Sequence, residues 1–138
     1  MISSKGRYAL RIMVELAERH AEEFVPLAEL ARAQDISPGY LARIMAELSK
    51  ASLVEAVQGK NGGYRLSRQP SDYRVGEILR CGGENTAPVS CLEAGQQACP
   101  RRPICRTVGL WERLGDMIQD YLDSVSLQDL MQDPKEEA

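Results

Sequence analysis

The stretch SPGYLARIMAELSKASLVEAVQGKNGGYRL, residues 37–66, decides the fold of this 138-residue chain. It opens with Ser37-Pro38, which predicts a helix start because serine caps helix N-termini and proline suits the first turn. The helix is expected to run to about Lys50. Its apolar residues recur at helical spacing and form one inward face, made of Leu41, Ile44, Met45 and Leu48.

The second half of the same stretch predicts a β-hairpin. Residues 53–57 contain β-branched side chains and residues 64–67 alternate apolar with polar ones, so both segments are expected to be strands. Between them, Gly59-Lys60-Asn61-Gly62-Gly63 predicts a tight turn, since Asn-Gly readily takes positive φ. A further short helix is expected from Arg74 to Arg80.

Two helices are predicted ahead of this stretch. Residues 4–20 carry apolar side chains at helical spacing behind a Ser4 cap, and a short helix begins at Pro26 and stops near Asp35. Three helices followed by a hairpin form a winged helix-turn-helix, with residues 28–48 as the helix-turn-helix and 58–63 as the wing tip. Because a fold does not determine function, a small domain without a nucleic-acid role stays open at this point.

The remainder of the chain predicts a loop and a long amphipathic helix. Residues 82–103 are rich in Gly, Pro, Ser and Gln, and a loop of this length is usually functional or disordered. From residue 104 onward, a heptad-like seam predicts a helix that pairs with a second copy of the chain, and an ordinary core helix is the alternative. The seam residues are Ile104, Trp111, Leu114, Ile118, Tyr121 and Val125.

The expected fold class is therefore mainly α with a small β-hairpin. A winged helix-turn-helix domain occupies residues 1–80, a cysteine-containing loop residues 81–103, and a dimerisation helix with a short terminal helix residues 104–132. Ser126 is expected to cap that terminal helix, and residues 133–138 to form a flexible tail.

Composition and charge narrow the class of protein. Residues 1–80 contain 12 Lys/Arg and 10 Asp/Glu, whereas residues 81–138 contain 5 Lys/Arg and 10 Asp/Glu. Only the N-terminal part, residues 1–80, is therefore suited to bind the phosphates of a nucleic acid. No apolar stretch reaches membrane-spanning length, and the N-terminus lacks the apolar core of a signal peptide, which predicts a cytoplasmic protein with no membrane partner. One histidine and no Gly-rich phosphate loop leave enzymatic activity without support.

Three cysteines, Cys91, Cys99 and Cys105, lie in or just after the predicted loop. Thiolates are soft ligands that select zinc, copper(I) or iron–sulfur clusters. Their spacing, Cys-x7-Cys-x5-Cys, is wider than that of structural zinc sites and matches no general ferredoxin signature. A group of more than one metal atom tolerates such gaps, and incidental cysteines are the alternative. Cys81, at the end of a predicted helix, is interpreted as a buried or half-buried thiol.

Four motifs in the right order resemble the IscR, NsrR and CymR group of winged-helix regulators. They are SKGRYALR at residues 4–11, ISPGYL at 36–41, Gly-x-x-Gly-Gly-Tyr-x-Leu at 59–66 and Cys-Arg-Thr-x-x-Leu-Trp at 105–111. The resemblance runs from residue 1 to about residue 131 and implies a homodimer that binds double-stranded DNA. In members with the three cysteines, it further implies an iron–sulfur cluster held by Cys91, Cys99 and Cys105, with 2Fe-2S favoured over 4Fe-4S.

The chain departs from the group's pattern around the implied cluster. The His that IscR-like members place three residues after the last cysteine is Val108, and the Asp that NsrR-like members place before the Tyr of the first motif is Arg7. The gap between the first two cysteines is two residues longer than is usual in IscR. The fourth ligand is therefore unassigned, with Cys81, a carboxylate of the partner copy, an exogenous thiol and water as candidates.

The positions that would read DNA differ as well. The Glu that IscR-like members carry in the third helix is Ala42, and their wing Arg is Gln58, so a target sequence does not transfer. The candidate contacts are Ser37, Gly39, Tyr40 and Arg43 for the major groove, Gln58 and Lys60 for the wing, and Lys5 and Arg7 for phosphate.

Together these features predict a homodimeric transcription regulator, interpreted as a repressor, that senses iron–sulfur or redox status through its cluster. Control of iron–sulfur assembly genes follows from the resemblance alone. The alternatives are a cluster-free regulator that senses thiols or a partner protein, and a zinc-stabilised structural domain.

Overall fold

The computed structural model describes residues 2–19, 23–82, 86–93 and 99–131. The helices are α1 (Ser4–Glu18), α2 (Leu27–Gln34), α3 (Pro38–Lys50), α4 (Val75–Cys81), α5 (Val108–Ser124) and α6 (Leu127–Met131), and the strands are β1 (Val54–Val57) and β2 (Gly63–Leu66). This arrangement confirms the expected class, mainly α with one antiparallel hairpin. The predicted tail, residues 133–138, lies outside the described residues.

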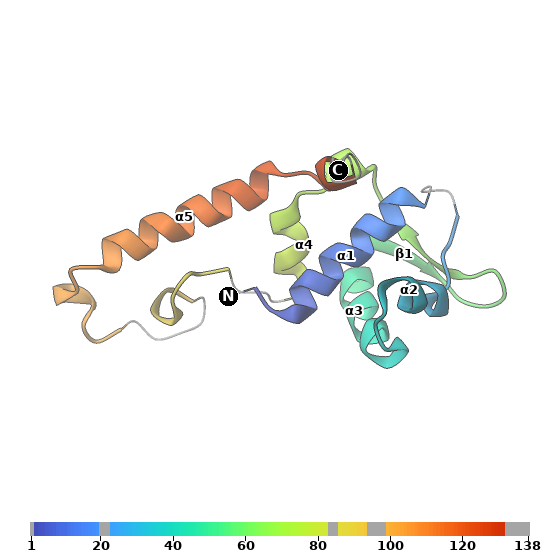
Figure 1. Ribbon diagram of the computed structural model, residues 1–138, viewed down its shortest axis with the longest axis horizontal. Coiled ribbons are helices and arrows are strands. Elements are labelled where there is room, and N and C mark those ends of the chain that lie inside the picture. The colour runs from blue at the N-terminus through green and yellow to red at the C-terminus, as the bar shows by residue number, and fades with distance from the viewer. Residues whose placement is uncertain (1, 20–22, 83–85, 94–98, 132–138) are drawn as a thin grey trace.

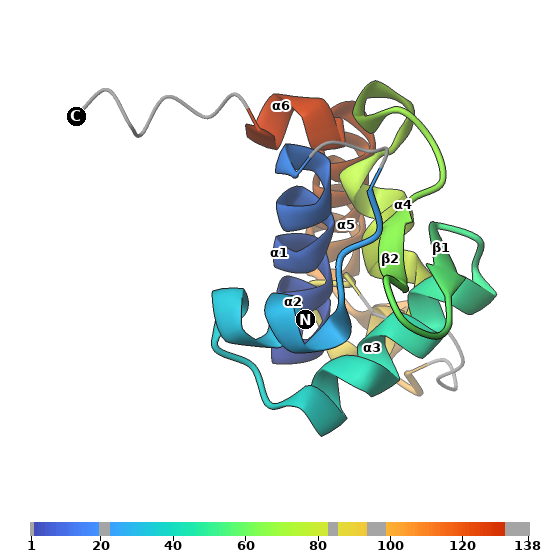
Figure 2. The ribbon, with the colours of Figure 1, turned by 90° about the vertical axis from the view of Figure 1, so that its right-hand side faces the viewer.

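One hydrophobic core holds the winged domain together. Helix α1 lies across the domain, with α6 at one end and α2 and α3 at the other (Figure 2), and the hairpin packs against α1 and α3. The apolar periodicity of α1 and α3 delivers fully buried side chains to this core, among them Ile12, Leu16, Leu41 and Met45. From the far end of the chain, Leu127 of α6 joins the same core. The C-terminal end of the described chain is thus part of the winged domain.

Side-chain hydrogen bonds cap α1, α3 and α6, and the starts of α1 and α2 differ from expectation. Ser3, not Ser4, caps α1, since its hydroxyl accepts from the amide of Gly6. Pro26 lies one residue before α2 rather than inside it. The cap of Ser37 on α3 is confirmed, as is that of Ser126, whose hydroxyl accepts from the amide of Asp129 at 3.0 Å.

The hairpin pairs Val54 with Leu66 and Val57 with Gly63. A third piece of backbone, which the sequence did not indicate, extends it. The amide of Val25 donates to the carbonyl of Tyr64 at 2.8 Å, and the amide of Tyr64 donates back to Val25 at 2.9 Å. The segment before α2 therefore holds the return strand of the wing in place.

Helix α5 projects from the winged domain as a separate arm; the described parts of the cysteine segment lead outward beside it, and α5 leads back to the domain (Figure 1). The expected start at residue 104 is wrong. Arg102–Ile104 form a short 3₁₀ turn, Cys105 has extended backbone, and the helix begins only at Val108. At 17 residues the arm is about 26 Å long. No helix among the described residues is long and apolar enough to cross a membrane.

Candidate DNA-binding surface and cysteine segment

The first turns of α3 present most of the predicted major-groove residues to solvent. Ser37, Gly39 and Arg43 are exposed, while Tyr40 is half-buried. The ring of Tyr40 packs edge-on against Tyr8, with ring centroids 5.9 Å apart, and the Arg43 guanidinium lies 5.5 Å from the Tyr40 centroid. Tyr40 therefore orients Arg43 and anchors α3 to α1, while the exposed N-terminal end of α3 stays open to a ligand.

The two predicted phosphate contacts at the start of α1 differ in availability. Arg7 is exposed and donates to the hydroxyl of Ser4 at 3.1 Å. Lys5 forms an ion pair with Glu47 of α3 at 2.7 Å. Because that ammonium already ties α1 to α3, a phosphate would have to compete with a carboxylate for it.

The wing tip is exposed and tightly turned. Gln58 and Lys60 are both exposed, and the amide of Gly62 donates to the carbonyl of Gly59 at 2.9 Å to close the turn. Asn61 has φ of 68°, as the Asn-Gly pair predicted. The tip thus presents the side-chain amides of Gln58 and Asn61 and the Lys60 ammonium group on a short turn.

The three cysteines are accessible thiols rather than core side chains. Cys91, in the short Ser90–Leu92 turn, is exposed, and Cys99 and Cys105 are half-buried. The Thr107 hydroxyl lies 3.4 Å from the Cys105 sulfur, and this hydrogen bond lowers the pKa of that thiol. Among the described residues, no three His, Cys, Asp or Glu side chains converge as metal ligands. The donor chemistry suits a soft metal or an iron–sulfur cluster, because thiolates are soft ligands. Each thiol is also at least partly exposed and so available to bind.

The cysteine segment is tied to α5 at three points. The hydroxyl of Thr86 donates to the amide oxygen of Gln119 at 3.0 Å, and Pro88 packs where Gly115 leaves room for it. Beyond Cys99, Arg102 forms an ion pair with Glu112. The described ends of the segment are therefore both fixed to the same helix.

Cys81 belongs to the winged domain. It lies in a small hollow lined by Lys5, Glu47 and Gly82, and burial raises the pKa of its thiol. It is half-buried, as expected for the cysteine at this helix end. A thiol whose charged form is disfavoured by burial is a poor ligand until its surroundings open.

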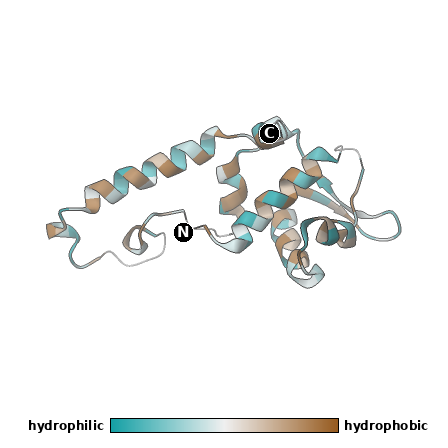
Figure 3. Ribbon diagram, viewed as in Figure 1, coloured by the Kyte–Doolittle hydropathy of each residue, from teal (hydrophilic) through white to brown (hydrophobic). Residues whose placement is uncertain are grey.

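Helix α5 has two apolar faces with different surroundings, and its alternating hydropathy is visible in Figure 3. Of the predicted seam, Trp111, Ile118 and Val125 are half-buried, whereas Leu114, Tyr121 and Ile104 of the preceding turn are exposed. The exposed stripe within the helix also includes two residues that the sequence reasoning missed. It consists of Leu110, Leu114, Met117 and Tyr121, which are 60%, 37%, 56% and 68% exposed. Their spacing of four, three and four residues was the signal for one face.

The model of a protein family described as an iron-dependent transcriptional regulator, Rrf2, matches residues 2–133. The chain belongs to the Rrf2 family. Among curated relatives, the HTH-type transcriptional regulator IscR of Aliivibrio salmonicida (strain LFI1238) is 38% identical over 132 residues, which is 96% of this chain and 77% of the relative. This Rrf2 protein is therefore a DNA-binding transcription regulator and not an enzyme.

Two solved structures extend the Rrf2 assignment to the arrangement of the elements. T. potens IscR superposes with a TM-score of 0.77 at 34% identity, covering 99% of this chain and 90% of that one. CymR, the global cysteine regulator of B. subtilis, superposes with a TM-score of 0.76 at 35% identity, covering 95% of each chain. One neighbour is thus called IscR and the other a cysteine regulator, so the shared fold alone does not decide the signal.

Proposed function

We propose that this Rrf2 protein is a homodimeric cytoplasmic repressor whose DNA binding depends on an iron–sulfur cluster held by Cys91, Cys99 and Cys105, with 2Fe-2S favoured. Control of iron–sulfur assembly genes is the role we infer. The observation that carries the proposal is that three accessible thiols lie on one segment tied at both ends to α5. In a plain structural domain, such thiols would gain by being buried in the core.

A bound cluster would supply a redox-active centre whose presence reports iron, sulfide and oxidant levels. The chain's own residues would do the rest. Cys91 lies before residues 94–98, and Cys99 and Cys105 lie after them, so ligation would join the two ends of the segment through one group. Arg102 and Glu112 then carry any movement of that segment to the first turn of α5. The dimer geometry of α5 in turn sets the spacing of the two α3 helices.

For the fourth ligand we propose a group from outside this chain: an exogenous thiol, water or a carboxylate of the partner copy. Val108 cannot ligate, and Arg7 donates to Ser4 from an exposed position. Cys81 sits in its own hollow beside Lys5 and Glu47. An externally supplied ligand predicts a cluster that exchanges or reacts more readily than one with four protein ligands.

Serine substitution of Cys91, Cys99 or Cys105 is expected to abolish iron and sulfide binding while leaving the fold intact, because hydroxyls replace the soft thiolate ligands. The measurement is anaerobic purification or reconstitution, followed by absorption spectroscopy and iron and acid-labile sulfide analysis. Cys81→Ser is the matched control and is expected to retain the full cluster. Full cluster content in all three serine variants would contradict the ligand assignment.

The same measurement separates the alternative functions. Zinc bound in place of iron and sulfide would support a zinc-stabilised domain. A metal-free protein that also resists reconstitution would support a regulator that senses thiols or a partner protein. Neither result would change the DNA-binding half of the proposal.

For DNA binding, Arg43→Ala is expected to weaken affinity for a duplex selected by the protein by about 10- to 100-fold, the usual effect of losing one base contact. Arg113→Ala removes another exposed arginine, on α5 instead of α3, and should change affinity less than twofold. Fluorescence anisotropy across a salt series measures both variants. Equal losses would show that bulk charge, rather than the α3 surface, accounts for binding.

A further inference from the structure

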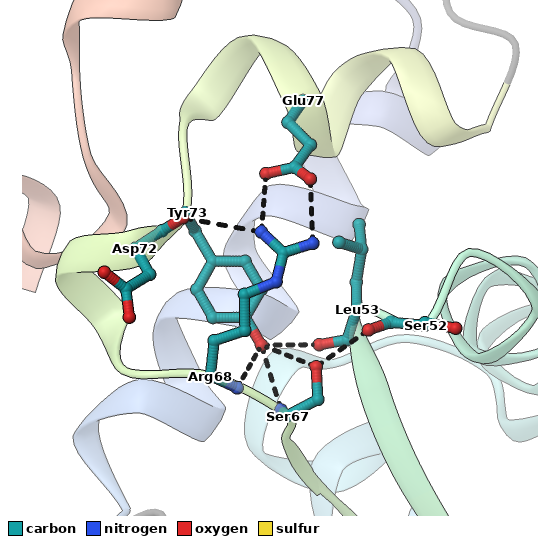
Figure 4. A network of polar contacts seen from close by, with 7 residues as sticks. All are labelled: Ser52, Leu53, Ser67, Arg68, Asp72, Tyr73 and Glu77. Carbon is teal, nitrogen blue, oxygen red and sulfur yellow. Dashed lines mark hydrogen bonds and ion pairs between the residues drawn. The ribbon is translucent and has the colours of Figure 1, made fainter.

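The hydroxyl of Tyr73 joins both ends of the wing hairpin (Figure 4). It donates to the carbonyl of Leu53, just before β1, at 2.7 Å. It accepts from the amides of Ser67 and Arg68, just after β2, at 2.9 and 3.1 Å. Tyr73 is 0% exposed, so each bond forms where an unpaired polar group would be strongly unfavourable. One side chain from the segment before α4 therefore closes the base of the hairpin.

Arg68 locks this base to α4. Its guanidinium donates two parallel hydrogen bonds to the Glu77 carboxylate, at 2.9 and 2.8 Å, and lies 4.9 Å from the centroid of the Tyr73 ring. The hydrogen bonds from Arg68 lower the pKa of Glu77, so the carboxyl is charged at neutral pH. A bidentate pair fixes orientation as well as distance. Arg68 is thus engaged inside the protein and is poorly placed to hold an external phosphate.

The same segment is tied to the end of α5. The amide of Val75 donates to the carbonyl of Val125 at 2.9 Å, and the amide of Leu127 donates to the carbonyl of Tyr73 at 3.2 Å. Residues 73–75 therefore lie between the hairpin base and the point where α5 ends. A two-stranded hairpin is only marginally stable by itself, so its orientation depends on what anchors its base.

We propose that Arg68 and Glu77 are positioning residues for DNA binding, which hold the wing tip at a fixed place relative to α3. With strand residues rising about 3.3 Å each, the tip lies ~15 Å from the base, and a rotation of ~10° would move it by ~3 Å. A displacement of that size breaks a hydrogen bond to DNA. The inference rests on the proposed contact of Lys60 with DNA and does not require a cluster.

The test uses Glu77→Gln in the full chain, with Glu55→Gln as its matched control. Glu55 pairs with Arg65 across the two strands at 2.9 Å, so both variants remove one negative charge and one ion pair near the hairpin. Removing negative charge by itself favours DNA binding. Glu77→Gln is nevertheless expected to weaken binding to a selected duplex by about tenfold. Glu55→Gln should leave affinity unchanged or slightly higher. Thermal melting of both variants checks that each is folded.

A double-mutant cycle with Lys60→Ala distinguishes positioning from general destabilisation. If Glu77 acts through the wing tip, the loss caused by Lys60→Ala shrinks in the Glu77→Gln background, and the salt slope falls by about one phosphate contact. Arg68→Lys, which keeps the charge but loses the bidentate geometry, should reproduce the effect.

Two results would overturn the inference, and they differ. If Lys60→Ala alone leaves affinity unchanged, the wing-tip contact itself is wrong. If Lys60→Ala weakens binding equally in both backgrounds, the contact stands and the positioning role of Arg68 and Glu77 fails.

Discussion

Gly63→Ala is expected to lower the melting temperature by about 10 °C and to weaken DNA binding with it. Gly63 has φ of +145°, and a Cβ there would lie 2.2 Å from the carbonyl oxygen of Val25. That oxygen accepts the amide of Tyr64, so the backbone must shift and the Val25–Tyr64 bridge must open. Backbone strain of about 1 kcal/mol and two lost hydrogen bonds of ~1 kcal/mol each give a loss of ~3 kcal/mol. For a domain of this size, that corresponds to roughly 10 °C.

Gly59→Ala is the control for this effect. Gly59 also has positive φ, +98°, but nothing lies within 4 Å of the position its Cβ would take. Its substitution should therefore destabilise by ~1 kcal/mol, from backbone conformation alone. Differential scanning calorimetry of the two variants measures the difference. Equal melting temperatures would mean that the close approach of Val25 contributes nothing.

The parts of the fold that the sequence predicts well are those set by neighbouring residues. Ser37-Pro38 starts α3, and Asn61-Gly62 turns the hairpin, because caps and tight turns are decided within a few positions. The periodicity of α1 and α3 likewise identifies their buried faces. Local sequence signals thus predict the winged domain, and the domain in turn places Arg43 and Lys60 at exposed positions.

Long-range contacts account for what the sequence does not predict. Tyr73 binds Leu53, 20 residues away, and nothing in the local pattern distinguishes it from any other aromatic residue. The bridge between Val25 and Tyr64 could not be predicted from the sequence either, since a single bridging residue has no periodicity. The heptad spacing places the start of α5 too early, because it includes Ile104, which lies in a 3₁₀ turn separated from the helix by the extended Cys105.

The seam predicted on α5 contains both half-buried and exposed residues, because the sequence pattern does not indicate long-range contacts. Periodicity identifies apolar side chains on a helix but not which neighbour each of them meets. Trp111 and Ile118 are half-buried, while Leu114 and Tyr121 are open to solvent. The candidate cysteines, by contrast, could be identified from composition because three thiols in a polar, Gly/Pro-containing segment are unusual in any role.

The exposed stripe of α5 makes the proposed dimer the feature most sensitive to a single substitution. Leu114→Lys is expected to convert a dimer of this protein into monomers at micromolar concentration. Losing the burial of the exposed part of Leu114 costs about 1 kcal/mol, and desolvating a lysine ammonium in its place costs about 1 kcal/mol more. A two-fold interface contains the position twice, so the loss is ~4 kcal/mol or about 10³-fold in the dissociation constant. Lysine favours helices, so α5 itself should persist.

Asp116→Asn is the matched control because it also raises the net charge by one but lies on α5 outside the exposed stripe. Asp116 is exposed, and its change should leave the dimer intact. Sedimentation velocity over a concentration series measures both variants. DNA binding should weaken in Leu114→Lys alone, because two joined recognition helices bind a two-fold operator far more tightly than separate ones. A Leu114→Lys protein that stayed dimeric would move the interface away from this stripe, whereas a monomeric wild type would remove the dimer from the proposed function.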